Sequence, residues 1–151
     1  MGRRTSTWNF CADIPTTLLD ANVILNVWDR DPDWYAWSRD QMRKTSFTDD
    51  LAINPILYAE ISTRFAASAD LDDKLEDLDV TVEPIPREAA FLAGKAFAQY
   101  RHQRGTKSNV PPDFFLGAHA TVLGCRLLTR DARRYAAYFP AVSLIAPPQI
   151  C

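Results

Sequence analysis

The stretch TTLLDANVIL, residues 16–25, places one aspartate inside an otherwise apolar run. The run predicts a strand-like segment from Thr17 to about Asn26, with Asp20 in its middle. An ionised carboxylate cannot enter a dry core without a partner, because losing its hydration costs more than the surrounding apolar contacts return. Asp20 therefore either marks the end of a strand at a surface or meets something positive there.

The composition is that of a globular domain. The chain has 151 residues, 47% of them hydrophobic and 24% charged, which suits one domain with its own core. A net charge of -2 gives no support for general nucleic-acid binding, although it leaves room for a local basic patch. We expect residues 1–15 to form an N-terminal arm and residues 16–151 to form a single domain.

The cysteines and the lengths of the apolar runs indicate the cellular compartment of the protein. Cys11, Cys125 and Cys151 are far apart and odd in number, so they form no disulfide framework and favour a reducing, cytoplasmic setting. No apolar run approaches the roughly 20 residues that a membrane span needs. We therefore expect a cytoplasmic protein with no membrane partner.

Short apolar segments alternate with longer amphipathic ones along the chain. This alternation predicts an α/β fold, with a central parallel sheet and helices on both faces. A sheet of this kind places its ligand site at the carboxyl ends of its strands. The expected strands beyond the opening stretch are residues 51–53, 80–85, 125–129 and 142–146, and the expected helices are residues 33–44, 54–68, 70–78, 86–104, 111–124 and 130–139.

Four acids fall at the ends of these elements or inside unusually apolar helices: Asp20, Glu60, Asp113 and Asp131. Each acid has a local explanation. Asp20 could be a turn residue, and Glu60 could pair with Arg64 one helical turn away. Asp113 suits the first turn of a helix, and Asp131 could be a helix N-cap. Together at one sheet edge, however, they would repel one another unless a cation offset their charge. Carboxylates without histidine or cysteine are typical ligands of Mg²⁺ and Mn²⁺.

Four motifs in order resemble those of PIN-domain ribonucleases, especially the VapC-type toxins of bacterial toxin–antitoxin pairs. They contain the four acids, and the resemblance runs from about residue 17 to residue 146, nearly the whole chain. No single motif is specific, but the four in this order make the resemblance strong. The motifs are LLDANVIL at 18–25, NPILYAEIS at 54–62, PPDFFLGAHA at 111–120 and LLTRDARRY at 127–135.

The resemblance implies a three-layer αβα sandwich around the parallel sheet and a Mg²⁺- or Mn²⁺-dependent endoribonuclease. It also implies an RNA substrate, a homodimer and a cognate antitoxin that silences the toxin. A bound cation would activate the attacking water and stabilise the leaving oxygen. We expect Asp20 and Asp113 to be direct metal ligands, and Glu60 and Asp131 to be ligands or to hold metal-bound waters.

Further residues are candidates for supporting roles. Asn22 and Thr129 could each hydrogen-bond an acid and fix its rotamer, while a turn or cap role for Asn22 and a strand-end role for Thr129 remain open. Arg104, Arg130 and Arg133 are close in sequence to expected site residues, so we take them as candidate RNA-binding residues.

Two other functions remain open at this point. The first is a haloacid-dehalogenase-like phosphatase, which also begins with an aspartate at a strand end. Such enzymes usually have a second aspartate two residues later, and Asn22 stands there instead. The second is a catalytically silent PIN-like module that binds RNA or protein without cutting. His119, six positions after Asp113, is expected to be a packed helix residue.

Overall fold

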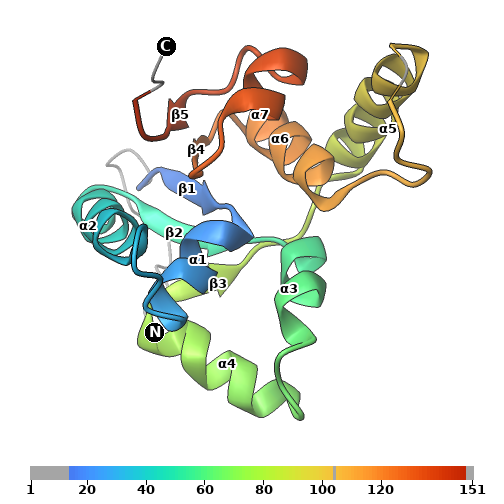
Figure 1. Ribbon diagram of the computed structural model, residues 1–151. Helices are drawn as coiled ribbons and strands as arrows, with labels where there is room; N and C mark the ends of the chain where they lie inside the picture. The colour runs from blue at the N-terminus through green and yellow to red at the C-terminus, as the bar shows by residue number, and fades with distance from the viewer. Residues whose placement is uncertain (1–13, 104, 149–151) are drawn as a thin grey trace, which may run out of the picture.

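The fold is built on a five-stranded parallel sheet in the order β3-β2-β1-β4-β5. The computed structural model describes residues 14–103 and 105–148, so most of the expected N-terminal arm lies outside the described residues. Helices cover both faces of the sheet (Figure 1), which confirms the expected αβα class. The strands are β1 (Thr16–Leu19), β2 (Asp50–Ile53), β3 (Val80–Val82), β4 (Arg126–Leu128) and β5 (Leu144–Ile145).

The helices fall into two layers. Right-handed crossovers place the helices that link β1, β2 and β3 on one face, and those that link β3, β4 and β5 on the other, as Figure 1 shows. Within the described ranges, no helix is both long enough and apolar enough to cross a membrane. The helices are α1 (Ala21–Trp28), α2 (Tyr35–Ser46), α3 (Pro55–Ser62), α4 (Ser68–Asp77), α5 (Arg87–His102), α6 (Pro112–Leu123) and α7 (Arg133–Tyr138).

Strand β1 lies at the centre of the sheet. It pairs with β2 on one side and with β4 on the other, with Leu18 opposite Ala52 and Leu127. Both sheet faces are covered at this position, so Leu18, Leu19 and Leu127 are almost fully buried. The chain runs from β1 to β2 and β3 on one side of the sheet, and then crosses back to β4 and β5 on the other side of β1. The carboxyl ends of β1 and β4 therefore form the switch point where ligands bind in open α/β sheets.

The expected strand from Thr17 to Asn26 is wrong beyond Leu19. Strand β1 ends there, and the rest of the apolar run forms helix α1. Val23 and Ile24 are fully buried in that helix. A short apolar run cannot be assigned to strand or helix from periodicity alone. Likewise, helix α3 ends at Ser62, before the expected end at residue 68.

The amino edge of the sheet is closed by a separate polar cluster. Asp49, just before β2, accepts hydrogen bonds from the Thr17 hydroxyl of β1 at 2.6 Å and forms an ion pair with Arg126 of β4 at 3.0 Å. Burial alone would raise the pKa of Asp49, but these bonds and the charge of Arg126 together lower it. The cluster ties three strands together at the edge opposite the acids of the predicted site.

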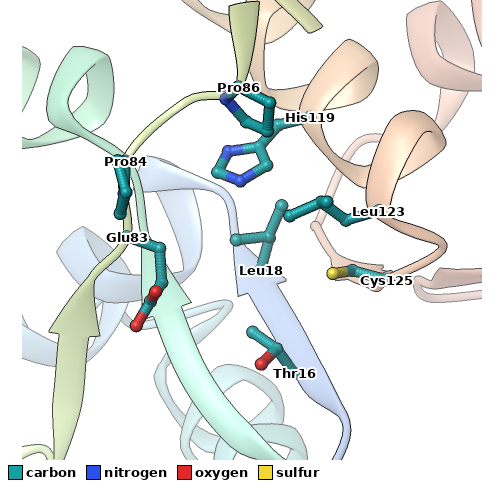
Figure 2. Close-up of a pocket in the computed structure, with 8 residues that line it drawn as sticks. All are labelled: Thr16, Leu18, Glu83, Pro84, Pro86, His119, Leu123 and Cys125. Carbon is teal, nitrogen blue, oxygen red and sulfur yellow. The ribbon is translucent and has the colours of Figure 1, made fainter. Parts of the chain in front are cut away.

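A small cavity of about 250 Å³ lies beneath the carboxyl-terminal half of α6. Figure 2 shows the ring of His119 between Pro86 above it and Leu18 below it, with Pro84 to the left. None of the four predicted acids lines this cavity. His119 is six residues beyond Asp113, or about 9 Å along a helix at 1.5 Å per residue, so the cavity is separate from the predicted site.

His119 is fully buried, as expected for a packed helix residue. The side-chain oxygen of Asn54, Oδ1, accepts a hydrogen bond from the Leu57 amide at 3.0 Å. The side-chain NH₂ group of Asn54 therefore faces Nδ1 of His119, at 3.4 Å. Nδ1 is then the acceptor and the ring proton is on Nε2, which has no partner among the described residues. Burial lowers the pKa of His119, while the charge of Glu83 raises it by less.

We predict that His119 makes the fold acid-sensitive. The pKa of His119 in the folded state lies below the unfolded value of about 6.5. The stability that the neutral ring contributes is therefore present above about pH 6.5, and it is lost as the pH falls through the unfolded and then the folded pKa. Chemical denaturation at a series of pH values falling from above about 6.5 should show a shallower loss of unfolding free energy for His119→Gln than for the wild type. Parallel curves for the two proteins would exclude this role.

A second prediction concerns Gly117 in α6. A Cβ added there would lie 2.4 Å from the Phe139 ring, whereas one added at Gly94 of α5 meets nothing within 4 Å. Phe139 is itself buried, so Gly117→Ala should destabilise by about 1–3 kcal/mol. Gly94→Ala is the matched control and should stabilise by up to about 1 kcal/mol. Thermal melts of both variants test this, and equal midpoints would contradict the packing described here.

Candidate active site

Asp20 is the first residue after β1 and lies at the switch point. Its amide donates to the Leu128 carbonyl of β4 at 2.9 Å, which fixes its backbone. It stands at the N-cap of α1, but its side chain makes no capping bond. Instead, Oδ2 accepts hydrogen bonds from the Thr129 hydroxyl at 2.9 Å and the Tyr135 hydroxyl at 2.8 Å. The carboxylate is therefore held by residues more than a hundred positions away.

Two more acids reach the same edge from helices. Asp113 is in the first turn of α6, where the helix dipole favours an anion, and Glu60 is near the end of α3. Helices α3 and α6 contact each other. The local explanation for Glu60, a pair with Arg64, does not hold, because Arg64 binds Asp29 at 2.6 Å instead.

The electrostatics show that these three acids share one site. Burial is the largest cause that raises the pKa of Asp20, and the charge of Asp113 adds to it, although the Tyr135 and Thr129 hydrogen bonds oppose the rise. Desolvation by the surrounding protein, followed by repulsion from Asp20 and Asp113, raises the pKa of Glu60. Burial also raises the pKa of Asp113, against the effect of Arg134. The three carboxylates are therefore close enough to repel one another.

The structure does not bring Asp131 together with these three acids. Its carboxylate forms an ion pair with Arg133 at 2.9 Å and is about half exposed. The hydrogen bond from Arg133 is the main cause that lowers its pKa. Oδ1 also accepts from the amide of Arg133, the first residue of α7, at 3.2 Å.

The predicted supporting residues differ in what they contact. Thr129 is fully buried and binds Asp20. The side-chain oxygen of Asn22 accepts a hydrogen bond from the Arg130 amide at 3.3 Å, and no bond from Asn22 to an acid is present among the residues that the structure describes. Of the two roles left open for Asn22, this contact matches the turn role, because it fixes the loop after β4.

The candidate RNA-binding arginines are also placed differently. Arg130 donates to the side chain of Asn26 at 3.1 Å and lies over the Trp34 ring at 5.5 Å. Arg133 extends toward solvent, with 81% of its side chain exposed. Arg104 lies outside the described residues.

Two residues of the site had no predicted role in holding the acids. Tyr135 is buried and its hydroxyl donates a hydrogen bond to Asp20; burial, followed by the charge of Asp20, raises its pKa well above the usual value. Arg134 binds Asp113, with Nη1 3.1 Å from Oδ2. Both follow LLTRDA in the fourth motif, but only the position of α7 beside α6 shows which acid each one binds.

The donor set matches a hard dication in its chemistry. Three carboxylates that repel one another present oxygen ligands and a negative charge to be offset. In the described ranges, no group of three or more His, Cys, Asp or Glu side chains is arranged so that it could hold a metal ion as it stands. Mg²⁺ usually keeps several waters and uses one or two carboxylates directly, so a full protein cage is unnecessary.

Comparison with known proteins identifies the fold. Solved structures with a similar fold include VapBC2 from Rickettsia felis bound to a promoter DNA fragment, with a TM-score of 0.65, 16% identity, and coverage of 87% of this chain and 98% of the other. VapBC-1 from nontypeable Haemophilus influenzae gives a TM-score of 0.65, 18% identity, and 87% and 97% coverage. A toxin–antitoxin complex from Klebsiella pneumoniae gives 0.57, 17%, and 89% and 99%.

No curated protein matches the chain in sequence. The sequence profile of the PIN domain, however, matches residues 17–140. That span begins in β1 and ends just after α7, so it includes Asp20, Glu60 and Asp113 together with the strands and helices that position them. The chain belongs to the PIN domain family.

Proposed function

We propose that the chain is a metal-dependent endoribonuclease and the toxin of a toxin–antitoxin pair. The observation that supports this most directly is the convergence of Asp20, Glu60 and Asp113 at the switch point of a PIN-domain sheet. Three carboxylates that repel one another destabilise the folded state. A function that needs all three explains why they are present together. Membership of the PIN family also sets aside the haloacid-dehalogenase-like alternative.

We assign the metal contacts by position. Asp20 and Asp113 would hold Mg²⁺ or Mn²⁺ directly, and Glu60, which lies toward solvent, would hold water around the ion. A cation there lowers the pKa of water and stabilises the negative charge that builds on the phosphate during cleavage. We assign Asp131 to the rim, where its carboxylate holds Arg133 in place.

The residues around the ligands do the positioning. Thr129 and Tyr135 both donate to Oδ2 of Asp20, and among the described residues no side chain donates to Oδ1. The buried Tyr135 hydroxyl also keeps its proton, because its pKa is raised well above the usual value. Asp20 therefore remains in one rotamer and keeps an acceptor oxygen for a cation. Arg133, largely exposed, and Arg130 would contact the RNA backbone.

Two protein partners are part of the proposal. A cognate antitoxin is supported by the structural neighbours, one of which is described as a toxin–antitoxin complex. A small DNA-binding protein encoded beside this gene, co-purifying with the chain and silencing its cleavage, would establish that partner. A neighbouring gene product that does neither would count against the toxin assignment.

A homodimer is the second partner assignment. Phe91, Val122 and Leu123 are 70%, 38% and 55% exposed. The end of α5 packs on the start of α6, with the Tyr100 and Phe114 rings 5.6 Å apart, so the start of α5 and the end of α6 share the other end of this hairpin. We propose that this apolar end joins two copies. Light scattering should give twice the 17.1 kDa chain mass, and a monomer would contradict it.

Asp20→Asn tests the nuclease assignment. The variant keeps the size of the side chain and an acceptor for Thr129 and Tyr135, but removes the charge. Total RNA should be cleaved by the wild type in Mg²⁺ and left intact in EDTA. We expect the variant to lose about 100-fold or more in activity, because even residues that only support metal ligands cost 10- to 100-fold when changed.

The same variant gives a readout that does not depend on cleavage. Mn²⁺ should raise the melting temperature of the wild type, because a ligand that binds only the folded state stabilises it, and should leave Asp20→Asn unchanged. Asp40→Asn is the matched control, since Asp40 pairs with Lys44 on the exposed face of α2. Cleavage that persists in EDTA would reject the mechanism. A wild type that binds RNA without cutting it in Mg²⁺ or Mn²⁺ would be a binding module.

A further inference from the structure

Arg134 is the cation in closest contact with the acidic cluster. Its Nη1 lies 3.1 Å from Oδ2 and 3.3 Å from Oδ1 of Asp113. The two side chains are 33% and 28% exposed, so the pair is partly shielded from water. Arg134 directly precedes Tyr135, which binds Asp20. Two neighbouring residues of α7 therefore hold the two acids that we assign as direct metal ligands.

The guanidinium group lies on an aromatic platform. Its central carbon is 5.4 Å from the centroid of the Tyr100 ring and 5.5 Å from that of Phe114. These rings pack against each other and against Tyr138. The Tyr100 hydroxyl also accepts hydrogen bonds from the Thr106 and Lys107 amides, so the platform is fixed. A planar cation over such rings is held in place.

The donors of Arg134 are only partly used. Both hydrogen bonds to Asp113 come from Nη1. Nε and Nη2 have no hydrogen-bond partner among the residues that the structure describes. A guanidinium group presents donors in a fork that matches the oxygens of a phosphate. The free donors of Arg134 thus lie next to the acids where the proposed reaction takes place.

We propose that Arg134 has two roles in the same place. It neutralises Asp113 while no metal is bound, and its remaining donors bind a phosphate of the RNA next to Asp113. This inference rests on the proposed nuclease function. The first role makes Arg134 a competitor of the metal for Asp113, and the second makes it a ligand of the substrate.

These two roles have opposite consequences when the charge of Arg134 is removed. Metal binding should become tighter, because Asp113 loses its positive neighbour. RNA binding should become weaker, because one phosphate contact is lost. An arginine that only supported the fold would not move the two affinities in opposite directions.

The experiment compares Arg134→Met, which keeps the length and packing of the side chain, with Arg134→Lys, which keeps the charge but not the fork. Arg43→Met is the matched control, since Arg43 is in the last turn of α2, which leads to the amino end of β2. Mn²⁺ binding without RNA is measured by calorimetry. Binding of a fluorescent single-stranded RNA of mixed sequence is measured in EDTA, where no cleavage occurs, over a range of salt concentrations.

Arg134→Met should bind Mn²⁺ about 10-fold more tightly than the wild type and the RNA about 10-fold more weakly. The slope of log affinity against log salt should fall by about 0.7, the value for one lost contact to a single strand. Arg134→Lys should keep the wild-type Mn²⁺ affinity and recover part of the RNA affinity. Arg43→Met should match the wild type in Mn²⁺ binding.

Weaker or unchanged Mn²⁺ binding by Arg134→Met would overturn the first role. An RNA affinity and salt slope equal to those of Arg43→Met would overturn the second. The wild type itself reports on the underlying function: a wild type that binds neither Mn²⁺ nor RNA overturns the nuclease proposal and this inference together. A wild type that binds both, with variants that do not differ from it, overturns this inference alone.

Discussion

The repulsion among Asp20, Glu60 and Asp113 is the constraint on which the rest of the site depends. Burial, followed by the charges of neighbouring acids, raises the pKa of Asp20 and Glu60, and burial raises that of Asp113, so keeping these carboxylates ionised at one sheet edge opposes folding. Two hydroxyl groups donate hydrogen bonds to Asp20, and one guanidinium group forms an ion pair with Asp113. These partners reduce the cost without removing the negative charge, so the site remains ready for a cation.

The sheet order explains how distant residues reach this edge. Strands β1 and β4 are neighbours in space but more than a hundred residues apart, and the carboxyl end of each contributes one side of the Asp20–Thr129 hydrogen bond. The amino edge of the sheet differs, because Asp49 there forms an ion pair with Arg126 and the pKa of Asp49 is lowered. One edge of the sheet is thus neutralised within the chain, whereas the other keeps an excess of negative charge.

The sequence was sufficient to predict the αβα class. It also predicted four acids at one sheet edge; the charge of Asp113 raises the pKa of Asp20 and Glu60 there, whereas Asp131 pairs with Arg133. It was not sufficient for the contacts between elements. The run after Leu19 has the composition of a strand, and only packing makes it α1. The partners of Tyr135 and Arg134 depend on how α7 lies against α6, which no local pattern encodes.

The account depends on Asp20 and Asp113 binding one cation between them. Anomalous diffraction from crystals soaked in Mn²⁺ tests this most directly, since it locates the ion without reference to activity. The account predicts a single strong peak at the carboxyl ends of β1 and β4, within bonding distance of both carboxylates. A peak elsewhere, or none at Mn²⁺ concentrations that support cleavage, would contradict it.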